Sequence, residues 1–335
     1  MSEQNRRLVL AERPSGMVDE STVKLQQDSV PSPGDGEALA RVRYLSIDPT
    51  IRTWMDDAPG YLPPIAIDEV VRSAGIAEVM ESNSGNYEPG QLLFGMTGWQ
   101  DYVIADEGER ALQTLPPGIP PTTALGLFGV TGMTAYFGLL DVGAMKEGDV
   151  VVVSGAAGAT GSTVGQIARL KGAGKVIGIA GGGKKCSWLG DEVGFDATID
   201  YKGEDVAARL REEAPEGIDL YFDNVGGEIL NACLGQLAMR GRVVLCGAIS
   251  QYNDRAAGTG PSNYVALIPR RGRMQGFIIL DYIARFPEGQ AEMAGWLSSG
   301  KIKSAEHVVE GLEHAPDALN LLFTGGNIGK VIVKV

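Results

Sequence analysis

Three glycines separate an apolar segment from an amphipathic one. Gly155, Gly158 and Gly161 follow the run VVVVS at 150–154 and precede a stretch up to Lys171 whose apolar residues have helical spacing. Between a buried strand and a helix, glycines at this spacing let backbone N–H groups and the helix N-terminus approach a pyrophosphate. The segment therefore predicts a dinucleotide-binding turn.

The end of the next predicted strand indicates which dinucleotide binds. Enzymes that use NAD carry Asp or Glu there, to hydrogen-bond the ribose 2′-hydroxyl. Here the strand ends at Ala180 and is followed by three glycines, Lys184 and Lys185. Two ammonium groups without a carboxylate can pair with a 2′-phosphate, whereas lysine near a helix start interacts unfavourably with the dipole. We expect NADPH; the alternative is that both lysines are solvated residues opening a helix.

The sequence lacks the ligands of a catalytic zinc. Zinc alcohol dehydrogenases use Cys, His and acidic ligands and keep one coordination position open. The only histidines, His307 and His314, lie late in the chain, and none of the three cysteines has a histidine nearby in the sequence. We expect no metal site and interpret both histidines as surface or packing residues.

A parallel sheet would position the glycine turn and the lysines. From about Pro120, apolar strands alternate with helical stretches, which is typical of βαβ units, and six strands suit a doubly wound sheet. The predicted strands are 150–154, 175–180, 197–199, 220–223, 242–246 and 275–280, and the predicted helices are 161–171, 184–192, 206–213, 228–237 and 290–299.

The first third of the chain has a different composition and pattern. It is rich in Pro and Gly, and short β-prone pieces at 37–44, 73–80 and 100–104 are separated by turn signals. A β pattern returns at 328–335. The predicted fold class is therefore α/β, with a Rossmann doubly wound parallel sheet and a second, mostly β domain.

Composition excludes several classes of function. With 335 residues and 44% hydrophobic content, the chain has enough apolar material for two domains. A net charge of −13 argues against binding to nucleic acid or to an anionic membrane. We see no signal peptide and no apolar run of about 18 residues, and Cys186, Cys233 and Cys246 form no CxxC pair. We expect a cytoplasmic protein with reduced thiols.

Six segments together resemble one known family over nearly the whole chain. They are YLSIDPTIRTWM (44–55), GWQDY (98–102), GVTGMTAYFGLLDVG (129–143), VVVSGAAGATGSTVGQIA (151–168), IDLYFDNVGGEIL (218–230) and CGAISQYN (246–253). The chain is similar to the zinc-independent medium-chain dehydrogenases/reductases of the leukotriene B4 dehydrogenase, or prostaglandin and alkenal/one reductase, branch. Bacterial curcumin reductase-like proteins are also similar.

The resemblance implies a domain plan and an activity. A GroES-like catalytic domain would comprise 1–122 and 301–335, and a Rossmann NADPH-binding domain 123–300. Members reduce the carbon-carbon double bond of α,β-unsaturated ketones or aldehydes by hydride transfer from NADPH to the β-carbon, and some oxidise alcohols. They are commonly homodimers that associate through the edge of the Rossmann sheet.

The resemblance also implies the residues that contact the cofactor. Lys185 and Tyr201 match contacts to the 2′-phosphate. The other implied contacts are Met133, Thr134, Gly155, Ala157, Gly158, Ala159, Thr160, Gly161, Gly181, Asn224, Cys246, Gly247, Ile249, Phe277 and Asn327.

Without a metal, the carbonyl of an enone needs another hydrogen-bond donor. A tyrosine, with a reference pKa of about 10, donates at neutral pH. We interpret Tyr252, which matches a tyrosine beside the substrate in the family, and Tyr61 as catalytic candidates. The alternatives are Tyr264 or the cofactor ribose hydroxyl as donor, with each tyrosine only an amphipathic wall of the pocket.

Some residues depart from the family or have a structural interpretation. Thr50 and Trp54 replace residues of the LSLDPYMRGRM segment of many relatives, so the substrate pocket is expected to differ. We expect Asp48 and Arg52 to pair across a turn, and Asp223 to cap a turn after its strand.

Two other functions remain open at this point. A quinone reductase uses the same fold and cofactor without zinc, and a noncatalytic NADPH sensor would bind the cofactor without an acceptor. Enone, enal and quinone are therefore the candidate substrate classes.

Overall fold

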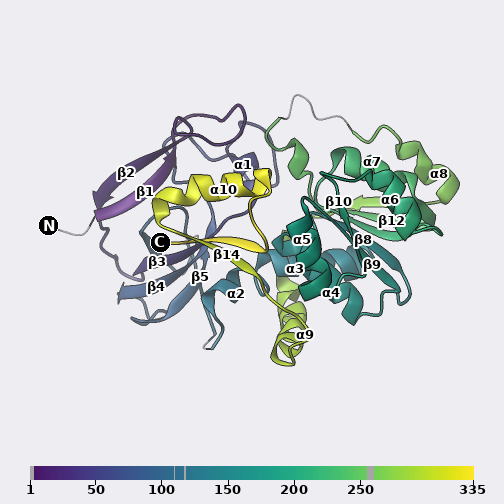
Figure 1. Cartoon of the computed structure of the whole chain (residues 1–335). Helices are drawn as coiled ribbons and strands as arrows, with labels where there is room; N and C mark the ends of the chain where they lie inside the picture. Colours follow the sequence, from purple (N-terminus) through teal and green to yellow (C-terminus); the bar gives the residue numbers. More distant parts are fainter. Residues whose placement is uncertain (1–3, 109, 117, 255–259) are drawn as a thin grey trace. The chain divides into compact units, whose positions relative to one another are not determined.

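Two compact units make up the chain in the computed structural model, which describes residues 4–108, 110–116, 118–254 and 260–335 (Figure 1). One unit comprises Met1–Leu125 with Glu306–Val335, and the other comprises Gly126–Ala305. No helix in the described part of the chain is long and apolar enough to span a bilayer.

The second unit contains a six-stranded sheet with every neighbouring pair parallel, in the order β10-β9-β8-β11-β12-β13. Its strands are β8 Val150–Ser154, β9 Lys175–Ala180, β10 Ala197–Asp200, β11 Ile218–Asp223, β12 Leu237–Leu245 and β13 Arg273–Gly276. Strand order reverses between β8 and β11, which is where doubly wound sheets bind ligands. The predicted Rossmann-type sheet is confirmed.

Helices cover both faces of this sheet. They are α3 Val130–Phe137, α4 Ala159–Leu170, α5 Gly183–Trp188, α6 Val206–Glu213, α7 Gly227–Gly235, α8 Leu267–Arg270 and α9 Phe286–Ser298. Val151 and Val153 of β8 belong to the core cluster that includes residues of α3, α4 and α9, whereas Val152 belongs to the cluster with α6 and α7. Alternate strand residues point to opposite faces, so an unbroken valine run is the pattern that a central strand with two covered faces requires.

The sixth predicted strand is present, but its bounds are wrong. The run at 275–280 was expected to be extended, but β13 ends at Gly276 and a 3-10 helix occupies Ile279–Arg285. Phe277 and Ile279 pack against the core cluster of α3 and α9. Their apolar character therefore reflects contact with helices and not membership of a strand.

The first unit is mostly β, as predicted. A seven-stranded sheet has the order β14-β15-β3-β4-β5-β7, with β6 also paired to β3, and β1 and β2 form a separate antiparallel pair. The strands are β1 Gln4–Leu10, β2 Val23–Ser29, β3 Ala38–Ser46, β4 Ala74–Ser82, β5 Leu92–Met96, β6 Tyr102–Ala105, β7 Gln113–Thr114, β14 Glu306–Glu310 and β15 Lys330–Lys334. The helices are α1 Thr50–Trp54, α2 Pro121–Leu125 and α10 Ala315–Thr324.

A buried ion pair joins the start of α1 to β15. Lys330 is fully buried; its Nζ lies 2.6 Å from Asp48 Oδ1 and donates to the carbonyl of Ile47 at 2.9 Å. The expected pairing of Asp48 with Arg52 is wrong, because Arg52 instead bonds Asp56, at 2.6 Å. Burial lowers the pKa of Lys330, and the Asp48 carboxylate acts against that shift.

We expect Asp48→Ala to lower the free energy of unfolding by about 3–5 kcal/mol, because the Lys330 ammonium would remain buried without its carboxylate. Denaturant titration measures this change. The matched control is Glu310→Ala, which removes the partner of Lys334 in an exposed pair of the same sheet at 3.2 Å and should cost less than about 1 kcal/mol. Equal losses for the two variants would contradict the prediction.

Candidate dinucleotide site

The glycine turn connects β8 to α4 and leaves helix N–H groups exposed to a ligand. Gly155 has φ +57°, and the N–H of Gly158 bonds the carbonyl of Gly155 at 3.0 Å. A Cβ on Gly161 would lie 2.4 Å from that carbonyl oxygen, so only glycine allows this close approach. No side chain caps α4, and its first N–H groups can therefore serve an anion.

This turn carries a group of the predicted cofactor contacts in continuous sequence. They are Gly155, Ala157, Gly158, Ala159, Thr160 and Gly161. The turn stands at the carboxyl end of β8, on the β8 side of the point where strand order reverses. Their placement matches what a pyrophosphate site requires.

A second turn follows β9 and receives a side chain from the turn after β10. A Cβ on Gly181 would lie 2.9 Å from ring atoms of Tyr201, so the ring rests directly on this glycine. Asp200 accepts hydrogen bonds from the N–H of Gly182 at 2.7 Å and of Lys202 at 3.0 Å, and thereby ties the two turns together. Gly181 and Tyr201, both predicted contacts, are therefore neighbours.

Lysines gather at these two turns. Lys185 is half-buried, and burial, together with the charge of Lys202, lowers its pKa. Lys184 is exposed on the same short helix, α5. Among the described residues none of the three lysines makes an ion pair with a carboxylate. An anion bound between Lys185 and Lys202 would relieve their mutual repulsion.

Three further predicted cofactor contacts, Met133, Thr134 and Phe277, differ in exposure. Met133 of α3 is fully buried, with its sulfur facing Gly289, whereas Thr134 is partly exposed and bonds the carbonyl of Val130 at 2.7 Å. Phe277 follows β13 and packs on Gly138. Thr134 is therefore better placed for a ligand than Met133.

The turns after β11 and β12 are held against each other by backbone hydrogen bonds. The N–H groups of Cys246 and Gly247 donate to the carbonyl of Asp223 at 2.9 and 3.1 Å, and the N–H of Ile249 donates to the carbonyl of Asn224 at 3.2 Å. These four predicted contacts, Asn224, Cys246, Gly247 and Ile249, thus follow two adjacent strand ends.

Tyr252 lies at the end of this segment with its hydroxyl against the chain. The N–H of Ala248 donates to the Tyr252 hydroxyl at 3.1 Å, and a Cβ on Gly247 would lie 2.9 Å from the same oxygen. A hydroxyl that accepts a hydrogen bond becomes a stronger donor through its own proton, because neighbouring bonds polarise one another. The arrangement orients Tyr252 and leaves its ring partly exposed.

Two of the predicted residues belong to the other unit. Tyr61 is exposed and meets Trp54 edge to face, with ring centroids 6.3 Å apart. Burial of the hydroxyl raises the pKa of Tyr61, so the group stays protonated at neutral pH. Asn327 is buried, and its amide donates to the carbonyl of Gly329 at 3.0 Å.

Two residues of the lysine-bearing turns were missed by sequence reasoning. Lys202 follows Tyr201 directly, so the signal was present, but its proximity to Lys185 depends on the pairing of β9 with β10. Asp200 was missed as the carboxylate that holds the turn. In contrast, the expected capping role of Asp223 is confirmed, because it accepts from the N–H groups of Val225 and Gly226 at 3.0 and 2.9 Å.

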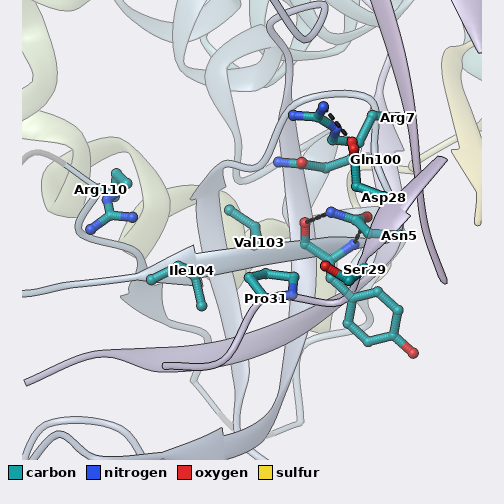
Figure 2. Close-up of a pocket in the computed structure, with 10 residues that line it drawn as sticks. Asn5, Arg7, Asp28, Ser29, Pro31, Gln100, Val103, Ile104 and Arg110 are labelled. Atoms are coloured by element: carbon teal, nitrogen blue, oxygen red, sulfur yellow. Dashed lines mark hydrogen bonds and ion pairs between the residues drawn. The ribbon is translucent and has the colours of Figure 1, made fainter. Parts of the chain in front are cut away.

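A hollow of about 470 Å³ lies elsewhere, in the first unit (Figure 2). Its lining residues are Asn5, Arg7, Asp28, Ser29, Pro31, Gln100, Tyr102, Val103, Ile104 and Arg110. None of the predicted site residues lines it. In the part of the chain that the structure describes, no cluster of three or more His, Cys, Asp or Glu side chains could hold a metal ion.

Comparisons with known proteins identify the family of the chain. A family described as "N-terminal domain of oxidoreductase" matches residues 6–113, and one described as "Zinc-binding dehydrogenase" matches residues 159–295. The NADPH-dependent curcumin reductase of Escherichia coli is 41% identical, covering 99% of this chain and 97% of that protein. The NADP(+)-dependent 2-alkenal reductase of Nicotiana tabacum is 37% identical, covering 99% and 97%.

A solved structure extends the match to the fold. CurA from Vibrio vulnificus, in complex with NADPH, superposes with a TM-score of 0.93 at 46% identity, covering 98% of this chain and 99% of that one. The chain therefore belongs to the medium-chain dehydrogenase/reductase superfamily, in its zinc-independent leukotriene B4 dehydrogenase and alkenal/one reductase branch.

Proposed function

We propose that the protein reduces the carbon-carbon double bond of α,β-unsaturated ketones or aldehydes with hydride from NADPH. It is an NADP-dependent oxidoreductase of its family, and relatives over nearly its full length are a curcumin reductase, an alkenal reductase and the (+)-pulegone reductase of Mentha piperita, at 34% identity. The observation that supports NADPH as the cofactor is the pair of turns after β9 and β10, where Lys202 lies close enough to Lys185 for its charge to lower the Lys185 pKa.

In this proposal the two units have different roles. The Rossmann unit holds NADPH through the glycine turn, with Lys185 and Tyr201 at the 2′-phosphate, and the mostly β unit serves as the catalytic domain. The bound cofactor supplies the hydride. Tyr252, and Tyr61 as the second candidate, would donate a hydrogen bond to the carbonyl oxygen, where negative charge develops as the enolate forms.

The test is NADPH oxidation with enones, enals and quinones, with the products identified by mass. A saturated ketone or aldehyde supports the proposal. A hydroquinone as the main product would assign the protein to quinone reduction, and binding of NADPH without oxidation by any acceptor would indicate a sensor.

We infer that the protein forms a homodimer through the Rossmann sheet. β13 is one of the two outer strands of this sheet, and among the described residues no strand pairs with its free edge. Tyr264, Val265 and Ile268 are exposed just before it, Ile268 to 75%. An unpaired edge beside exposed apolar side chains suits pairing with a second copy.

Sedimentation at micromolar concentration should therefore give a dimer, and Ile268→Glu should shift it toward the monomer by placing charge in the apolar patch. Ile67→Glu is the control, since Ile67 is also exposed but lies in the first unit. A wild-type protein of monomer mass would refute the dimer.

Lys185→Ala should weaken NADPH binding by about 10- to 150-fold, because a charge-assisted contact contributes roughly 1.5–3 kcal/mol. NADH, which lacks the 2′-phosphate, should bind almost unchanged. Lys184→Ala is the matched control and should have a smaller effect, since Lys184 is more exposed than Lys185. Titration calorimetry with both cofactors measures these affinities. Equal losses of NADPH and NADH in Lys185→Ala would reject the assignment.

Tyr252→Phe should slow enone reduction by about ten- to a thousandfold, the range seen when an oxyanion donor is removed. The ring remains while the N–H of Ala248 loses its acceptor, so NADPH affinity and melting temperature are measured in parallel and should change far less than turnover. Steady-state kinetics on the best enone, with Tyr61→Phe in parallel, measures the effect. Wild-type turnover of Tyr252→Phe would leave Tyr252 as a pocket wall and favour Tyr61 or the nicotinamide ribose.

A further inference from the structure

A fully buried carboxylate lies at the point where the sheet reverses its strand order. Asp223 is the last residue of β11, and its Oδ1 accepts a hydrogen bond from the Tyr221 hydroxyl at 2.6 Å and from Ser154 Oγ at 3.0 Å. The same oxygen accepts from the N–H groups of Val225 and Gly226. Four donors thus meet on one oxygen, and none of them is a cation.

This network links three turns. Ser154 Oγ, at the end of β8, also accepts from the N–H of Asn224 at 2.9 Å, and the Asn224 amide donates to the carbonyl of Ser154 at 2.7 Å. The main-chain carbonyl of Asp223 accepts from Cys246 and Gly247 after β12. Asp223 therefore fixes the relative positions of the glycine turn, the Asn224 turn and the segment that leads to Tyr252.

The sheet itself does not need a carboxylate at this place. Of the two strands that pair with β11, β12 ends in Leu245, which carries no polar side chain, and β8 ends in Ser154, which is neutral and belongs to the network itself. Burial of a carboxylate without a counter-ion costs free energy, and Asp223 Oδ2 is buried without a hydrogen-bond partner among the described residues. A buried group with that cost calls for an explanation beyond the fold.

We propose that Asp223, held by Tyr221 and Ser154, is a positioning residue of the cofactor site. In this proposal Asp223 makes no contact with the dinucleotide. It fixes the positions of the turns that would contact the pyrophosphate and the nicotinamide of NADPH. The turns of Lys185 and Tyr201 follow β9 and β10. Among the described residues no hydrogen bond joins either turn to Asp223, Tyr221 or Ser154, so we expect the adenosine 2′-phosphate half to be independent of the network. The inference rests on the dinucleotide site proposed above.

Tyr221→Phe tests the network while keeping a buried ring in place. NADPH and NADH should both weaken by the same factor, about tenfold for loss of a hydrogen bond to a charged group, and single-turnover hydride transfer at saturating NADPH should also slow. Adenosine 2′-monophosphate would occupy only the part of the site at Lys185 and Tyr201. Its affinity, measured by ligand-observed NMR titration, should equal that of the wild type. Ser154→Ala should reproduce this pattern.

Tyr136→Phe is the matched control. The Tyr136 hydroxyl donates to Glu292 Oε2, also at 2.6 Å, between α3 and α9 of the same unit. Tyr136→Phe removes a side-chain hydrogen bond from the same unit outside the network, and it should leave NADPH affinity unchanged.

Equal NADPH affinity in Tyr221→Phe and Tyr136→Phe would overturn the proposal and leave Asp223 a structural residue. If the affinity for adenosine 2′-monophosphate falls by the same factor as the affinity for NADPH, the proposal is also overturned, because equal losses indicate a general destabilisation of the unit. A wild-type protein that binds no NADPH would instead reject the proposed function, so the two failures are distinguishable.

Discussion

The pairing of β8 with β11 is the constraint on which the rest of the Rossmann unit depends. Strand order reverses there, so the connections on the two sides run to opposite faces and leave the carboxyl ends of both strands uncovered. The glycine turn follows one of these strands and Asn224 follows the other. The bonds between Ser154 and Asn224 bridge the same point, so the site is built where the topology leaves room for it.

Local signals made much of this unit predictable. The valine run, the glycines at three-residue spacing and the absence of a carboxylate after β9 all lie within 150–185. The end of the edge strand β13 was harder to predict. Phe277 and Ile279 have the composition of a strand, yet they pack among helices, and periodicity does not distinguish a short buried strand from another buried apolar segment.

Contacts between residues that are distant in the sequence could not be predicted from it. Lys330 and Asp48 are brought together by the pairing of β15 with β3, and a nearby arginine gave the wrong partner for Asp48. Asp200 and Lys202 belong to the turn after β10, and only sheet pairing places them beside Gly182 and Lys185. The lysines also show that a chain with a net charge of −13 can present a local cationic site, because binding responds to nearby charges.

The position of β15 has a consequence for how the chain acquires its structure during synthesis. β15 lies between β14 and β3, so the sheet of the first unit is joined through residues 330–334. The Rossmann unit, in contrast, is one continuous stretch from Gly126 to Ala305. Because domains generally fold as units while the ribosome proceeds, the later-encoded unit can mature first, and the unit that begins the chain must wait for β15 to emerge. Until then part of the β3 edge lacks its partner, and an unpaired strand edge of this kind can pair with other chains.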